Sequence, residues 1–174
     1  MSATRILFGL WSATAAAFVI LWFWGALNLP DRVPVHLDIT GAPTRWGSRW
    51  ELLGVLGIAG PLTIALPALI ATWIRRGGKL THVNIPHKEW WLAEPERERE
   101  VRRRVAFDLL AISFLTGVLF VGALAGTIVQ ARSPQPETVM WPTWLLWISV
   151  AAIILYAVLA STVRYRIDPA ERRN

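Results

Sequence analysis

Four long runs without a charged residue divide the chain into apolar and polar segments. They cover residues 6–27, 52–74, 109–131 and 143–163. Each run reaches the roughly 20 residues that a helix needs to cross the hydrocarbon core of a bilayer. Because no water inside lipid can satisfy exposed amides, each run is predicted to close its own hydrogen bonds as a helix. The runs are continuously apolar rather than alternating, which argues against a membrane β-barrel. The pattern predicts an all-α polytopic membrane protein with four transmembrane helices.

Most of the basic residues fall on one side of these four spans. With the N-terminus inside, the outer face carries Arg32, Arg45, Arg49 and Arg132. The other 14 of the 18 lysines and arginines lie on the inner face: Arg5, Arg75, Arg76, Lys79, Lys88, Arg97, Arg99, Arg102, Arg103, Arg104, Arg164, Arg166, Arg172 and Arg173. Because loops rich in Lys and Arg stay in the cytoplasm, both termini are predicted to be cytoplasmic. The chain then forms one four-helix membrane domain over residues 1–174, with an outer loop at 28–51 and an inner loop at 75–108.

The composition agrees with this class and excludes others. Of the 174 residues, 54% are hydrophobic and 17% are charged. This hydrophobic content is too high for a disordered chain or an ordinary soluble domain. Cysteine is absent, which excludes disulfide scaffolds and thiolate metal sites. The net charge of +6 flanks the spans, so it is interpreted as a topology signal that faces lipid headgroups and not as a nucleic-acid interface.

The first run has a second interpretation, a cleaved signal peptide. Ala15 and Ala17 form an A-x-A pattern after a basic start. Cleavage there would leave an aromatic N-terminus at residues 18–24, whereas the uncut run has spanning length, so the uncut helix is favoured. Tryptophans support it, because they gather at the predicted outer boundary and, once, at the inner one, as an aromatic belt does. They are Trp22, Trp24, Trp46, Trp50, Trp141 and Trp144 outside, with Trp73 inside.

The outer loop contains a predicted extended segment. Pro30 and Pro34 hold the backbone extended where it leaves the lipid. Apolar and polar residues alternate over 35–39, and a turn is predicted at 40–43. The loop is too small for its own core, so we expect it to pack on the outer helix ends.

The third span is predicted to be the end of a longer helix. Pro95 favours a helix start, and the acidic residues that follow it early and the basic residues late match the helix dipole. Further along, Gly122 and Gly126 form a G-x-x-x-G pattern that lets two helices approach closely. Packing within the bundle is favoured over contact between protomers.

Residues for catalysis or metal binding are sparse. No His or Lys lies within a span, and no hydrolase motif is present, so we expect no enzyme. His36 and Asp38 raise a metal hypothesis, but two ligands do not close a zinc site, and a local hydrogen bond to the imidazole or to a turn amide is favoured. No cofactor or metal is predicted. Asp108 is expected at the interface, neutralised by Arg104 or by water, with a proton or ion relay as the alternative.

Two loop motifs carry a resemblance to a known family. The outer loop reads Leu29-Pro30-Asp31-Arg32-Val33-Pro34-Val35-His36-Leu37-Asp38, followed by Gly41, Pro43, Arg45, Trp46, Gly47 and Ser48. The inner loop reads Asn84-Ile85-Pro86-His87-Lys88-Glu89-Trp90-Trp91-Leu92. Together they resemble the family of bacterial membrane proteins that includes the N-terminal region of the SdpI immunity protein. The chain departs from that family's usual pattern at Leu37, Thr44, Arg49, His87 and Trp90.

The resemblance implies a bacterial inner-membrane protein whose outer loop detects or neutralises a secreted peptide toxin, with an inner loop that engages a regulator. It marks as candidate binding residues Pro30, Pro34, His36, Asp38, Gly41, Arg45, Trp46, Gly47, Asn84, Pro86, Lys88 and Trp91. Each also has a structural interpretation, which is favoured at any single position: the prolines and glycines shape the backbone, and Trp90 and Trp91 dock the inner loop onto headgroups.

The sequence thus favours a non-enzymatic integral membrane protein, immunity-like or sensory, that binds a peptide or other ligand at the outer loop. The alternative is an accessory subunit of a membrane complex or a small transporter component, suggested by the glycines of the second and third spans. The lipid bilayer is the expected partner in either case.

Overall fold

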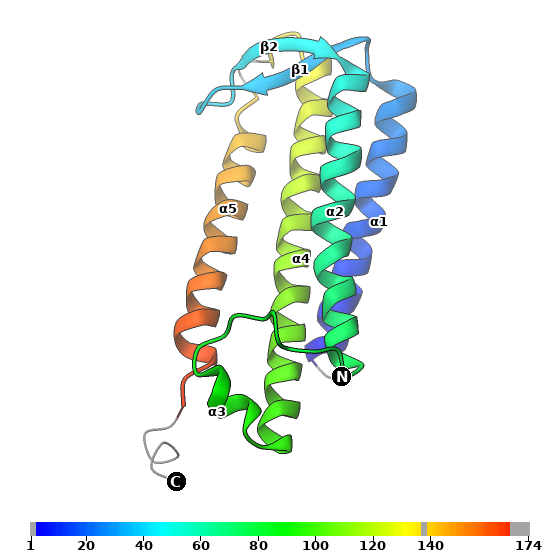
Figure 1. Cartoon of the computed structure of the whole chain (residues 1–174). Helices are drawn as coiled ribbons and strands as arrows, with labels where there is room; N and C mark the ends of the chain where they lie inside the picture. Colours follow the sequence, from blue (N-terminus) through cyan, green and yellow to red (C-terminus); the bar gives the residue numbers. More distant parts are fainter. Residues whose placement is uncertain (1–2, 137–138, 168–174) are drawn as a thin grey trace.

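The computed structural model describes residues 3–136 and 139–167. Within them, long helices form an elongated bundle with a short β-hairpin across one end (Figure 1). In chain order the elements are α1 (Ala3–Asn28), β1 (Arg32–Leu37), β2 (Pro43–Ser48), α2 (Arg49–Arg75), α3 (Lys88–Leu92), α4 (Pro95–Arg132), α5 (Trp141–Leu159) and the π-helical turn η2 (Ala160–Arg164). Arg172 and Arg173, which the charge analysis assigned to the inner face, lie outside the described residues.

The four predicted spans are confirmed as helices. The helices α1, α2 and α4, and α5 together with η2, are each long and apolar enough to cross a membrane. The chain is therefore a multi-pass membrane protein. Each helix extends its predicted run by a few residues or more, and α1 passes through Ala15 and Ala17 without a break.

Helix α4 is the centre of the bundle. It packs against α1, α2 and α5, whereas α5 contacts no other long helix extensively within the described residues. Figure 1 shows α5 on the opposite side of α4 from α1. The predicted helix start at Pro95 is confirmed, and the helix runs on without interruption into the third span.

Glycines allow the helices to approach α4 closely. A side chain at Gly117 would meet Thr14 of α1, and side chains at Gly122 and Gly126 would overlap Leu145 and Pro142 of α5. The prediction that the G-x-x-x-G pattern serves packing within the bundle is thus confirmed.

Indole N–H groups form hydrogen bonds between helices in the apolar interior of the bundle. Trp11 of α1 donates from Nε1 to Ser113 Oγ of α4 at 2.8 Å and to the Ile64 carbonyl of α2 at 3.1 Å. Trp22, which was predicted to belong to the outer belt, donates to the Leu53 carbonyl of α2 at 2.8 Å. These bonds satisfy polar groups that lipid could not satisfy.

The two motif loops lie at opposite ends of the bundle, as predicted (Figure 1). We call these the hairpin end and the α3 end. At the hairpin end, Leu29 and Val33 are buried in one core cluster with residues of α1, α2 and α4. The expectation that this loop packs on the helix ends is therefore confirmed, although its second strand, β2, was not predicted.

Asp108 pairs with a different arginine than expected, and the prediction that Arg104 neutralises it is wrong. The carboxylate is buried, and it accepts hydrogen bonds from the hydroxyls of Tyr156 at 2.7 Å and Tyr165 at 2.6 Å. Its ion-pair partner is Arg164, whose Nε lies 2.9 Å from Oδ1. The reason is the π-helical turn η2, at the end of which Arg164 and Tyr165 lie beside α4. Asp108 thus holds the end of α5 against α4.

Candidate functional site

The site begins with the β-hairpin that connects α1 to α2. Strands β1 and β2 pair antiparallel, with Arg32 opposite Ser48 and Leu37 opposite Pro43, and the register shifts on either side of His36. Ser48 then caps α2, because its hydroxyl accepts from the Trp50 amide at 3.2 Å. The hairpin is thus fixed directly to the start of a membrane-spanning helix.

Asp38 organises the tip of this hairpin. Its Oδ1 accepts from the Thr40 hydroxyl at 2.6 Å, the Thr40 amide at 2.8 Å and the Ala42 amide at 3.0 Å. These bonds, that of the Thr40 hydroxyl first, hold the pKa of the Asp38 carboxyl below its ordinary value. The predicted hydrogen bond to a turn amide is therefore confirmed for Asp38, and the residue acts as a turn former.

Gly41 joins the hairpin tip to α4 and α5. Its φ of +92° is in the left-handed region that favours glycine, and an added Cβ would overlap Thr143 Oγ1 of α5. Its carbonyl accepts from Gln130 Nε2 of α4 at 3.0 Å. Only the amide nitrogen can donate to a carbonyl, so Gln130 Oε1 has to face elsewhere. The hairpin tip therefore contacts the ends of both α4 and α5.

A pocket of about 430 Å³ lies beneath this tip, between the hairpin, α4 and α5. It is lined by Leu37, Asp38, Ile39, Ala123, Thr127, Gln130, Pro142, Thr143, Leu146 and Trp147. This volume is within the range of small-molecule and side-chain binding pockets. Most of the lining is apolar, so the pocket suits an apolar group.

Two polar atoms of the lining residues are buried without a hydrogen-bond partner among residues 3–136 and 139–167. They are Gln130 Oε1, in a side chain that is fully buried, and Thr143 Oγ1. Buried polar atoms are nearly always satisfied, so an orphaned pair beside a pocket calls for an explanation. A carbonyl oxygen and a hydroxyl can together bind a group that carries an N–H donor, such as a peptide amide.

The hairpin residues with charged side chains stabilise the hairpin itself. Arg45 Nη2 lies 2.6 Å from Glu51 Oε1 at the start of α2. Arg49 donates to the Leu29 carbonyl at 2.6 Å, and its other terminal nitrogen lies 3.5 Å from Asp31. These contacts tie both ends of the loop to one another.

Of the predicted hairpin residues, Asp38 and Gly41 belong to the pocket region and the others do not line it. Pro34 is buried in β1, and Gly47 lies close to Val35 and Glu51, where a side chain would not fit. The remaining ones have exposed positions on the hairpin or before it: Pro30, His36, Arg45 and Trp46. The structure therefore splits the predicted outer set into a tip and an outer surface.

The predicted inner residues lie at the α3 end and take no part in this pocket. Asn84 and Pro86 are exposed, and Lys88 Nζ donates to the Thr81 carbonyl at 2.5 Å. Trp91 is buried and packs edge-on against Tyr165. The prediction that Trp91 docks on headgroups is wrong, because α3 folds its indole inward against α4 and η2.

Sequence reasoning missed the α4 and α5 side of the pocket. Gln130 could have been recognised from the sequence as a candidate site residue, because it is a polar residue in the last turn of an otherwise apolar span. Thr143 and Trp147 carried no signal, since hydroxyls and tryptophans are common at the ends of spans. Among the residues that the structure describes, no group of three or more His, Asp or Glu is placed to hold a metal.

Comparison with known proteins places the chain beside proteins without an assigned function. The sequence pattern of a family described as a domain of unknown function (DUF1648) matches residues 13–60, which cover most of α1, the hairpin and the first part of α2. An uncharacterized protein of Archaeoglobus fulgidus is 24% identical over 153 residues, 84% of this chain and 83% of that relative. No solved structure matches. These similarities support a membrane-protein family of unknown function.

Proposed function

We propose that this protein is a non-enzymatic, immunity-like or sensory membrane protein that binds an apolar peptide segment in the pocket at the hairpin end. The observation that carries the proposal is the orphaned pair of polar atoms, Gln130 Oε1 and Thr143 Oγ1, beside an apolar pocket. A peptide offers both an apolar side chain and an amide donor. The membrane concerned is the bacterial inner membrane, with the hairpin on the outer side.

Binding displaces the hairpin tip. The two orphaned atoms are covered, and Gly41 lies directly over Thr143 and accepts from Gln130. A ligand therefore has to displace Gly41 to reach Thr143 Oγ1, which breaks the hydrogen bond from Gln130 Nε2 to the Gly41 carbonyl and lifts the tip from the helix ends. This makes the Gly41–Gln130 hydrogen bond the element that differs between the free and bound states.

The resemblance of the loop motifs to the family that includes the SdpI immunity protein supports the immunity-like role. In the outer motif, Asp38 and Gly41 form the tip that covers the pocket. The alternative, an accessory subunit or transporter component, stays a prediction. Of the glycines that suggested it, Gly57, Gly60, Gly117, Gly122 and Gly126 are covered by neighbours within the chain, whereas no described atom lies within 4 Å of a Cβ added at Gly54.

Filling the pocket tests the proposal. Ala123→Phe places a ring into the lining, whereas Ala151→Phe makes the same change at an exposed position of α5. Cells that express the wild type or Ala151→Phe should survive challenge with at least one of a panel of secreted membrane-active peptides. Cells with Ala123→Phe should lose that protection at least tenfold in the inhibitory concentration.

The outcomes are distinct. Absence of protection by the wild type against every peptide, at verified expression, contradicts the immunity-like role. Protection by Ala123→Phe equal to the wild type contradicts the pocket. His36 and Trp46 are exposed positions on the hairpin. If His36→Ala and Trp46→Ala abolish protection while Ala123→Phe does not, the binding site lies on the outer surface of the hairpin.

A further inference from the structure

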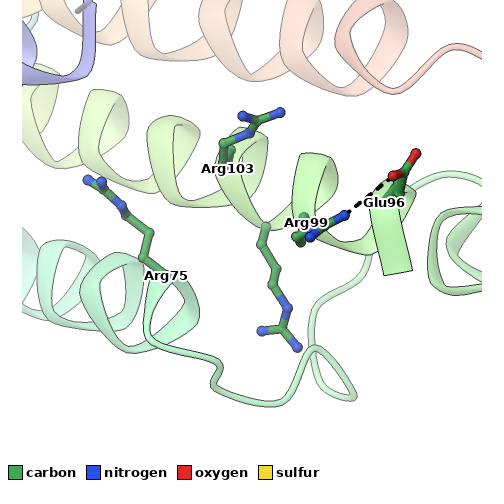
Figure 2. A pocket seen from close by; sticks show the side chains of 5 residues that line it. Arg75, Glu96, Arg99 and Arg103 are labelled. Carbon is green, nitrogen blue, oxygen red and sulfur yellow. Dashed lines mark ion pairs between the residues drawn. The ribbon is translucent and has the colours of Figure 1, made fainter. Parts of the chain in front are cut away.

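A second and larger pocket lies at the α3 end, between the last turn of α2 and the first turns of α4. Its volume is about 630 Å³, and Arg75, Glu96, Arg99, Arg102 and Arg103 line it (Figure 2). The lining has four guanidinium groups and one carboxylate and is therefore basic, although Glu98 and Glu100 beside it pair with Arg102 and Arg103. Nothing in the proposed function uses this pocket.

Arg102 is the fixed part of this pocket. It donates to the backbone carbonyls of Ile74, at 3.3 Å, and Gly78, and its Nε lies 3.0 Å from Glu98 Oε1. These bonds fasten α4 to the end of α2 and hold one positive charge in place. A preorganised charge binds an anion without first losing conformational entropy.

The other arginines are free to turn toward a ligand. The side chains of Arg99 and Arg103 are 72% and 76% exposed, and their partners are Glu96, at 3.5 Å, and Glu100. Exposed ion pairs stabilise a fold only slightly, so a phosphate can replace them. Arg75 has no ion pair among the described residues. Figure 2 shows it on α2, across from the arginines of α4.

The basic pocket lies at the end of a candidate membrane span. Arg75 is the last residue of a membrane-spanning helix, and the exposed indole of Trp73 precedes it by two positions. Tryptophans and arginines at span ends mark the headgroup region. Guanidinium groups match phosphate oxygens with two parallel hydrogen bonds, and basic pockets beside transmembrane helices bind anionic lipid headgroups.

An apolar groove adjoins the basic pocket and is lined by residues of the candidate membrane spans. This groove of about 340 Å³ shares Arg75 with the basic pocket and lies between α1, α2 and α4. Its apolar lining includes Phe8, Trp11, Ala65 and Leu110. A basic pocket and an apolar groove that share one arginine match the two parts of a phospholipid, its charged headgroup and its acyl chain.

We propose that the α3 end binds one anionic phospholipid, with its phosphate among Arg75, Arg99, Arg102 and Arg103 and an acyl chain in the groove between α1, α2 and α4. The adjoining groove favours a lipid over free phosphate, because free phosphate would leave the apolar part empty. The proposal is independent of peptide binding at the hairpin end.

Native mass spectrometry of the full-length protein tests it with dioleoyl phosphatidylglycerol as the probe. The wild type should retain one such lipid per chain at least tenfold more tightly than dioleoyl phosphatidylcholine. The double variant Arg75→Gln/Arg103→Gln should lose this preference about tenfold. The control Arg76→Gln/Arg166→Gln removes the same charge at the same end, outside the pocket lining, and should change affinity less than twofold.

A second pair of variants tests the groove. Ala65→Phe fills it and should weaken phosphatidylglycerol binding, whereas Ala151→Phe should not. Equal losses in both arginine double variants, or phosphatidylcholine bound as tightly as phosphatidylglycerol, would overturn the proposal. Full competition by millimolar inorganic phosphate, with Ala65→Phe binding lipid normally, would assign the site to free phosphate instead.

Discussion

At the scale of single residues, Asp38 and Asp108 behave in opposite ways. Asp38 is an exposed carboxylate that organises a turn through local hydrogen bonds. Asp108 is a buried carboxylate whose partners come from a helix end far along the chain. The bonds of Asp38 could be predicted from the residues that directly follow it in the sequence. Those of Asp108 form only when α5 packs on α4.

Asp38 makes the hairpin tip sensitive to acid. Because its pKa lies below the ordinary value of 3.8, the carboxylate stabilises the turn at neutral pH, and this stabilisation is lost as the pH falls through the lowered pKa. We expect the amide proton of Thr40 to titrate by NMR with a midpoint below 3.8. A midpoint at or above 3.8 contradicts the bonded turn. Asp38→Asn, whose amide oxygen accepts the same bonds, should keep the turn and abolish the titration.

Asp108 is expected to stabilise the fold through Arg164. Asp108→Asn keeps one of the two oxygens that accept from the tyrosine hydroxyls, replaces the other with an NH2 donor and leaves Arg164 without its counter-charge, so the free energy of unfolding should fall by about 1–2 kcal/mol. The Arg164 side chain is 36% exposed, which keeps the loss moderate. A double-mutant cycle with Arg164→Gln, measured by unfolding in detergent, should give a clear coupling energy. Additive losses would show that the pair does not interact.

At the scale of elements, glycines set the distance between α4 and α5. Gly126→Ala would drive its methyl group into the Pro142 ring, which cannot move aside without shifting α5. We expect a loss of about 1–3 kcal/mol and a melting temperature lower by several degrees. Thermal denaturation in detergent, followed by circular dichroism, measures it.

Gly9→Ala is the matched control for this prediction. Gly9 also lies in a long helix, but nothing lies within 4 Å of an added Cβ. Its stability should change by no more than about 0.5 kcal/mol. Equal melting temperatures for the two variants would mean that α4 and α5 do not pack as described.

The elements differ in how far the sequence could predict them. The spans could be predicted, because lipid forces an apolar run of that length to be a helix. The extended segment before Asp38 could be predicted too, since prolines and alternation mark it. Strand β2 could not, because Arg45, Trp46 and Gly47 show no alternation and pair only through their partner strand. The pocket could not be predicted from the sequence either, because Gln130 and Thr143 come together only where α4 packs on α5.

At the scale of the whole molecule, the hairpin end and the α3 end are predicted to face different compartments. The chain has no cysteine, so single cysteines introduced at exposed Ile39 and His82 report each end without background. A membrane-impermeant maleimide added to intact cells should label Ile39→Cys and should label His82→Cys only after lysis. Labelling of both in intact cells contradicts the topology, and the reverse pattern contradicts the orientation.

The length of α4 has a mechanical consequence. Its 38 residues form a rod of about 57 Å, which exceeds the roughly 30 Å of hydrocarbon by about half its length. A tilt of about 5° around one tip sweeps the far tip through about 5 Å. A small change in the tilt of α4 at the hairpin end therefore produces a displacement of several ångströms at the α3 end.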